Sequence, residues 1–149
     1  FLNAIGLGRW RPKLAHRLTS DMYNHDFDSE GPMAWICSDP QVCKDYIENP
    51  KTGFRFTVNA NKVLMGLMIG AYSSRGPKAG KKYMPVIFLS GGDDPCTGGT
   101  HGLDKALAAM HAVGYKDICK KTYPAMRHEV LNEIGKERVW QDVLDFMNL

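Results

Sequence analysis

The hydrophobic pattern of the chain changes at about residue 83. Residues Met84 to Leu89 form a continuous apolar run between turn-forming residues, which is typical of a strand buried on both faces of a parallel sheet. A helix is predicted to follow from about residue 100, because Leu103, Leu107 and Met110 recur on one helical face. This part of the chain therefore begins with a strand and then a helix.

The same order of elements recurs towards the end of the chain. Residues Asp117 to Tyr123 predict a second strand. A last helix is predicted from about Lys136 to Met147, with a broad apolar face made of Val139, Trp140, Val143, Leu144 and Met147. Strands that alternate with helices are typical of an α/β fold with a parallel sheet.

Residues 1–82 favour helices instead. Three helices are predicted there, beginning near Pro12, at Pro40 after Asp39, and at an Asn59 cap; residues 24–32 between the first two are rich in turn formers. The apolar faces of the first and third helices consist of Leu14, Leu18 and Met22 and of Val63, Leu64, Leu67, Met68, Ala71 and Tyr72. We expect residues 1–82 to form a helical cap over the edge of a sheet that residues 83–149 build.

Composition narrows the functional class. The 149 residues are 44% apolar and 23% charged, as in a soluble globular domain. The net charge of +3 and the scattered basic residues argue against a nucleic-acid partner. The longest apolar run, Val63 to Tyr72, is far shorter than the roughly 18 residues of a membrane span, so neither an integral membrane segment nor a signal peptide is predicted.

The four cysteines show no spacing typical of a disulfide framework or a zinc site. We interpret them as reduced thiols of a cytoplasmic protein. They are Cys37, Cys43, Cys96 and Cys119.

Candidate chemistry lies just after each predicted strand. The first strand leads into Asp93 and Asp94, and the second leads into His128. Because the carboxyl ends of parallel strands meet at one edge of a sheet, these side chains are expected to lie close together. A carboxylate beside an imidazole can fix the imidazole tautomer and support its positive charge, as an acid–base relay requires.

Two motifs carry a resemblance to a known family. Residues 88–95, FLSGGDDP, resemble the strand-and-acid motif of lysophospholipase-like α/β-hydrolases, and residues 120–133, KKTYPAMRHEVLNE, resemble their histidine motif. In the cap region, residues 34–39 and 46–57 are similar to the family's W-L-x-x-D and Y-x-x-D-P…G-F-x-F-T elements. The resemblance, to the lysophospholipase and monoacylglycerol-lipase type of the serine aminopeptidase-like hydrolases, therefore covers nearly the whole chain.

The resemblance implies a partial α/β-hydrolase fold and hydrolysis of carboxylic esters of lipids without a cofactor. It implies that Asp94 is the acid and His128 the base of a Ser-Asp-His triad, with Asp93 as the rival acid. Ser38 and Asn49 depart from the family pattern, which often has arginine and aspartate there. Both departures lie in the cap and concern substrate preference.

The serine of such a triad is absent from the chain. The family serine lies in a G-x-S-x-G turn, and the oxyanion-hole donors come from the residue after it and from an earlier loop. No serine here has flanking glycines of that kind. We therefore expect a missing N-terminal half of the same fold to supply the nucleophile.

Three aromatic residues are candidates for substrate binding. Trp35, Phe54 and Phe56 either line an acyl-binding groove or only join cap to core. No metal site is predicted, because acidic loops such as that around His25 are usually just exposed. Alternatives to an esterase remain a peptidase, a dehalogenase or epoxide hydrolase with an aspartate nucleophile, and a catalytically inert fragment or binding module.

Overall fold

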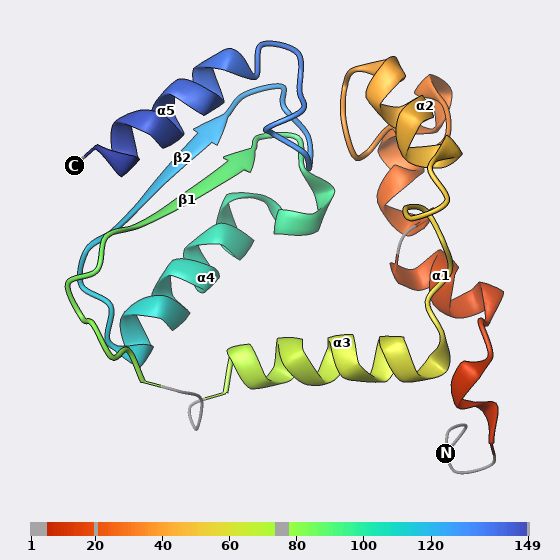
Figure 1. Cartoon of the computed structure of the whole chain (residues 1–149), viewed down its shortest axis with the longest axis horizontal. Coiled ribbons are helices and arrows are strands. Elements are labelled where there is room, and N and C mark those ends of the chain that lie inside the picture. Colours follow the sequence, from red (N-terminus) through yellow and green to blue (C-terminus); the bar gives the residue numbers. More distant parts are fainter. Residues whose placement is uncertain (1–5, 20, 74–77, 149) are drawn as a thin grey trace.

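The computed structural model describes residues 6–19, 21–73 and 78–148. Two strands and five α-helices lie in this part of the chain (Figure 1), together with three short 3₁₀ segments. The helices and strands are α1 (Lys13–Thr19), α2 (Pro40–Glu48), α3 (Val58–Ala71), β1 (Val86–Gly91), α4 (Gly99–Val113), β2 (Ile118–Tyr123) and α5 (Glu137–Met147). The 3₁₀ segments are η1 (Leu7–Arg9), η2 (Asp21–Glu30) and η3 (Pro95–Thr97).

The two strands pair in parallel, as the pattern predicts. Their register runs from Val86 opposite Ile118 to Gly91 opposite Tyr123. The connection through α4 provides the helical crossover that parallel strands need. In Figure 1, α4 lies along one side of the strand pair and α5 along the other. The order strand, helix, strand, helix confirms the predicted α/β class.

The first strand differs from its prediction in position and in burial. It begins after Pro85, which has no N–H to donate, and continues to Gly91 instead of ending at Leu89. Its first four residues are only half-buried, and the middle of β2 is exposed. The expected burial on both faces is therefore wrong for this chain, because the described residues form a sheet of two strands only.

The N-terminal elements differ from the prediction at three places. Helix α1 ends at Thr19, so Met22 lies in η2 and not on the face of this helix. Helix α2 has Asp39 as its N-cap, with a carboxylate oxygen that accepts from Gln41 N at 2.9 Å. Helix α3 is capped by Thr57, whose hydroxyl accepts from Ala60 N at 3.1 Å, so the predicted Asn59 cap is wrong. The stretch predicted as turns lies mostly within the 3₁₀ segment η2.

Two separate clusters form the core. One consists of Trp35, Ile36, Cys37 and Cys43, and the other of Tyr123, Met126, Val130 and Val139. Glu129 N donates to Ile36 O at 2.8 Å and joins the segments that carry the two clusters. This contact brings the N-terminal elements to the end of the strand pair.

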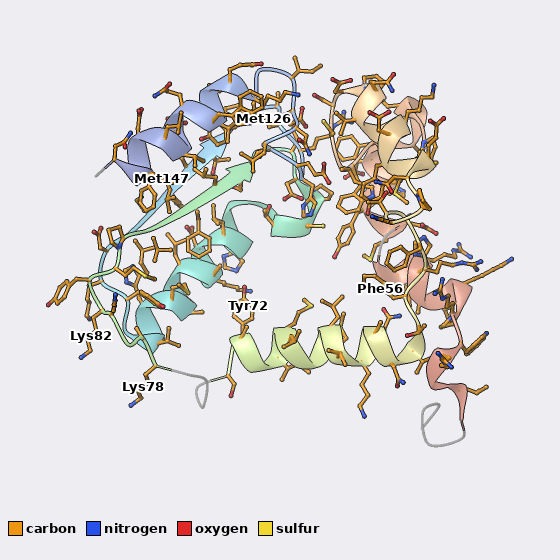
Figure 2. All side chains as sticks on the ribbon, in the orientation of Figure 1. Phe56, Tyr72, Lys78, Lys82, Met126 and Met147 are labelled. Carbon is orange, nitrogen blue, oxygen red and sulfur yellow. The ribbon has the colours of Figure 1, made fainter. Side chains whose placement is uncertain are left out.

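Several predicted apolar faces are exposed among the described residues. Leu14, Leu18 and Met22 are exposed, and α3 contains no buried residue. Figure 2 shows the side chains of α3 projecting from the helix, with Tyr72 at the end towards α4. On α5 only Val139 is buried, while Trp140, Leu144 and Met147 are exposed.

No helix in the described part of the chain has the length and apolar character to cross a membrane.

Candidate active site

Asp94 lies at the end of the loop that leaves β1. It is buried, and one carboxylate oxygen accepts from Cys96 N at 2.8 Å as the N-cap of η3. Two backbone hydrogen bonds attach this loop to the segment that follows β2: Gly92 N donates to Tyr123 O at 2.8 Å, and Asp93 N donates to Met126 O at 3.0 Å. The backbone therefore fixes the position of the Asp94 carboxylate.

Glycine is required where the two motif loops cross. A Cβ on Gly91 would lie 2.2 Å from the carbonyl oxygens of both Met126 and Arg127. No side chain fits at that distance. Gly91 thus permits a close approach between the acid loop and the histidine loop.

His128 contacts the Asp94 carboxylate directly. Its Nδ1 lies 3.1 Å from the second carboxylate oxygen of Asp94, within hydrogen-bonding distance. Since an ionised carboxylate only accepts, Nδ1 carries the hydrogen and Nε2 is left as the basic nitrogen of the neutral ring. The exposed Asp93 instead bonds through its backbone to Met126, so the structure brings Asp94, not Asp93, to the imidazole.

The Asp94 contact also changes the acidity of the imidazole. The hydrogen bond to Asp94 raises the pKa of His128 above its ordinary value of 6.5, against the opposing effect of partial burial. The ring packs on Trp35, with a centroid distance of 5.1 Å. A raised pKa and a fixed tautomer suit a group that takes up a proton during a reaction.

Arg127, next to His128, binds the N-terminal elements. Both terminal nitrogens are used: one donates to Ala34 O at 2.7 Å, and the other contacts both carboxylate oxygens of Glu30 at 2.8 Å. The guanidinium also lies over the Phe27 ring, 4.1 Å from its centroid. Such charge-assisted contacts fix geometry well.

Glu133 makes the second connection. Its carboxylate is fully buried and accepts from Arg127 N at 2.8 Å and from Ser38 N at 2.9 Å. It also accepts from the Ser38 hydroxyl and, at 3.2 Å, from Ile134 N. We call Arg127 and Glu133 the clamp, because together they attach the His128 loop to residues 30–38.

Sequence reasoning did not assign roles to the clamp. Both residues stand inside the histidine motif, Arg127 directly before His128 and Glu133 as its last residue, and a charged residue within a specific motif was the available signal. Their partner Glu30 stands in an acidic loop and gave no signal. The serine at position 38, noted as a departure from the family pattern, is the residue whose backbone and hydroxyl both meet Glu133.

Cys96 lies beside the pair. Its thiol contacts Tyr23, and partial burial together with the charge of Asp94 raises its pKa to about 12. The thiol therefore stays protonated and is a poor nucleophile. Ligand atoms of Asp94, Cys96 and His128 lie within 4.8 Å of one another, which makes them the group in the described chain that could hold a metal ion. His128 Nδ1 and the Asp94 carboxylate already form a hydrogen bond with each other.

The three aromatic candidates line one cavity. Trp35, Phe54 and Phe56 all border a space of about 310 Å³ that lies between the 49–57 loop and the start of α3. The Phe54 and Phe56 rings are 5.7 Å apart, and Phe56 is labelled beside the N-terminal elements in Figure 2. Trp35 lines this cavity and also packs on the His128 ring, whereas His128 and Asp94 are not among the residues that line it.

Three of the other histidines make contacts with residues close to them in sequence. His16 Nε2 lies 3.3 Å from Asp21, His25 Nδ1 lies 3.1 Å from Asp26, and His111 Nδ1 lies 3.0 Å from Tyr115 O.

Comparison with known proteins gives a family and a fold. A thermostable carboxyl esterase from Bacillus coagulans, solved with glycerol, superposes with a TM-score of 0.80 at 21% identity over 99% of this chain and 48% of its own. A lipase in an open form gives 0.75 at 17% identity over 95% and 47%. The chain thus spans about half the length of each. No curated protein sequence matches it.

The family model described as serine aminopeptidase, S33, matches residues 3–135, which include the acid loop, the histidine loop and the clamp. The two solved structures share its fold over nearly all of the chain. We conclude that the chain belongs to the S33 serine aminopeptidase family of α/β-hydrolases and has part of that fold.

Proposed function

We propose that this chain supplies the acid and the base of a serine hydrolase that cleaves carboxylic esters of lipids, of the lysophospholipase or monoacylglycerol-lipase type. The observation that carries the proposal is the contact of 3.1 Å between His128 Nδ1 and the buried Asp94 carboxylate. It leaves Nε2 free to act as a general base.

In this reaction His128 Nε2 takes the proton of a serine hydroxyl as the serine oxygen attacks the ester carbonyl. The proton then passes from Nε2 to the leaving alcohol as the ester C–O bond breaks, which leaves the acyl-serine. Water, deprotonated by the same nitrogen, attacks the acyl carbonyl; the acyl-serine bond breaks, the acid is released, and the proton returns from Nε2 to the serine oxygen. Asp94 orients the ring and stabilises the imidazolium at both stages.

The nucleophile and the oxyanion hole must come from outside these 149 residues. No G-x-S-x-G occurs in the sequence, and this chain corresponds to about half of each solved relative. We propose that a further segment of the same fold pairs beside β1 and supplies both. Residues 1–82 would act as the cap and 83–149 as the C-terminal part of the core, in a cytoplasmic enzyme.

Labelling with a fluorophosphonate probe tests this function in the native protein that carries the chain. We expect the probe to label a serine outside residues 1–149, and His128→Gln to slow labelling by roughly 10³-fold or more. Asp94→Asn should slow it less. Asp93→Asn, one position away and without contact to the imidazole, is the matched control.

Unchanged labelling in His128→Gln would overturn the proposal. Absence of any labelled serine would instead favour an aspartate nucleophile, as in dehalogenases and epoxide hydrolases, or an inert chain.

A peptidase is the second candidate, because the matching family model is described as a serine aminopeptidase. The same pair would serve an amide with an amine leaving group. Comparing aminoacyl arylamides with lipid esters as substrates separates the two. Arylamide turnover that exceeds ester turnover would favour the peptidase.

A further inference from the structure

An open cavity of about 600 Å³ lies beside α1 and is strongly basic. Arg11, Lys13, Arg17 and Arg55 line it, and Asp21 is its one acidic lining residue. Asp21 is already occupied by His16, at 3.3 Å. Within the described part of the chain, none of the four basic side chains has a carboxylate partner in an ion pair.

This cavity accounts for the whole net charge of the protein. The chain has 19 lysine and arginine residues and 16 aspartate and glutamate residues. Four of the former and one of the latter line the cavity, so the remaining 15 of each sign cancel. A concave surface of one sign concentrates field and attracts an opposite charge.

The basic cavity adjoins the aromatic cavity. His16, Gly53 and Phe54 line both spaces. Gly53 has a φ of +63° and sits against the Tyr46 ring, 3.6 Å from where a Cβ would lie. A residue with a side chain would strain the backbone there, so glycine suits the turn at the junction.

Two residues that line the aromatic cavity each carry a buried polar atom with no hydrogen-bond partner among the described residues. Trp35 is more than nine-tenths buried, yet its Nε1 donates to no group, and Asn61 Oδ1 accepts from none. Both residues line the cavity, whose other walls include Phe54, Phe56 and Leu64. Buried polar groups without a partner cost free energy, and a ligand with a carbonyl or hydroxyl group in an apolar body would satisfy them.

We infer that the two cavities form one binding site for an anionic, single-chain amphiphile. Its phosphate or carboxylate head lies among Arg11, Arg17 and Arg55, and its apolar body lies along Phe54 and Phe56 towards Trp35. This inference rests on the proposed function for its link to catalysis, and it deepens that function by assigning an ester substrate with an anionic end. Binding itself needs neither His128 nor a serine.

Binding of dodecyl phosphate to the full chain tests the site. Calorimetric titrations below the critical micelle concentration, at low salt, would compare it with zwitterionic dodecylphosphocholine and with inorganic phosphate. We expect dodecyl phosphate to bind at least about fivefold more tightly than dodecylphosphocholine, since each exposed charge contact contributes modestly. Inorganic phosphate at the same concentration should not displace it.

Charge-reversal variants test whether the basic cavity causes the preference for dodecyl phosphate. Arg17→Glu combined with Arg55→Glu should abolish the preference for dodecyl phosphate. The control is Lys105→Glu combined with Lys116→Glu, which makes the same change in net charge at exposed positions remote from the cavity. The control should keep the preference, and circular dichroism should show both variants folded.

Four results would overturn the inference. The first two are equal affinity for the two amphiphiles and displacement of dodecyl phosphate by inorganic phosphate. The third is an equal loss of preference in the control variant. The fourth is a cavity variant, Arg17→Glu with Arg55→Glu, that no longer adsorbs to phosphatidylglycerol vesicles but binds monomeric dodecyl phosphate with unchanged affinity. The outcome is independent of the fluorophosphonate test. Selective binding combined with normal labelling in His128→Gln would retain this ligand class and reject the hydrolase mechanism.

Discussion

The His128 loop and helix α3 differ in how far their side chains are buried. The loop is fixed by buried contacts that cross from residues 30–38 to residues 127–133, including the fully buried Glu133 carboxylate. Helix α3 is richer in apolar residues, yet none of its side chains is buried. Among the described residues, burial is therefore found where polar contacts join distant segments around the candidate site and not along this apolar helix.

Among the variants that test this difference, removal of the Glu133 side chain of the clamp should have the largest effect on the unfolding free energy. Glu133→Ala leaves the buried Arg127 N and Ser38 N without an acceptor, and we expect unfolding free energy to fall by about 3 kcal/mol. Urea denaturation of the full chain measures the change. Glu129→Ala, whose hydrogen bond to Asn132 is exposed, is the control within the same motif and should cost about 0.5 kcal/mol or less. Equal losses in the two variants would contradict a special role for the clamp.

A side chain at Gly91, where the two loops cross, should have the next largest effect on stability. Gly91→Ala places a methyl group 2.2 Å from two carbonyl oxygens, and we expect a loss of about 2 kcal/mol with a shift of the His128 loop. Gly80→Ala is the control, since a Cβ there meets nothing within 4 Å. Thermal denaturation of both variants would give the difference, and a Gly91→Ala variant as stable as the control would refute the close approach.

The smallest effect is expected in α3, and it has the opposite sign. Gly66 lies inside the helix with open space around it, so Gly66→Ala should stabilise α3 by about 0.5–1 kcal/mol through helix propensity. Amide hydrogen exchange along residues 58–71 measures this. Gly102 in α4 is the matched helical glycine, but its Cβ would collide with Thr97 O at 1.7 Å. If Gly66→Ala instead destabilised α3, then the helix would have a packing partner.

The sequence predicted the elements that local rules determine. Asp39 and Pro40 begin α2, and the order of strand and helix after residue 83 follows from pattern and turn residues. The same rules placed Asp94 and His128 at one edge of the sheet. The structure confirms that they meet, at 3.1 Å.

The features that the sequence did not predict correctly depend on contacts between distant segments. The apolar faces of α1 and α3 predict burial, but burial needs a second surface that periodicity cannot reveal. The clamp joins positions 95 residues apart, Ser38 and Glu133, and no local pattern specifies such a pair. The close crossing of two loops at Gly91 likewise depends on residues 126 and 127, which are far away in the sequence.

The pH dependence of His128 follows from its raised pKa. As the general base of the proposed reaction it must be neutral, so the proposed esterase activity should disappear as pH falls through a value above 6.5. The sign for stability is the reverse: the Asp94–imidazolium contact contributes fully below pH 6.5 and is lost as pH rises through the folded-state pKa.

An NMR titration of the His128 ring tests the central claim most directly, because it observes the pair without requiring a nucleophile. We predict a pKa above 6.5 with the hydrogen on Nδ1 in the neutral form, and a lower pKa in Asp94→Asn. Asp93→Asn should leave the titration close to that of the parent chain. A pKa at or below 6.5 that does not respond to Asp94→Asn would contradict the acid–base pair.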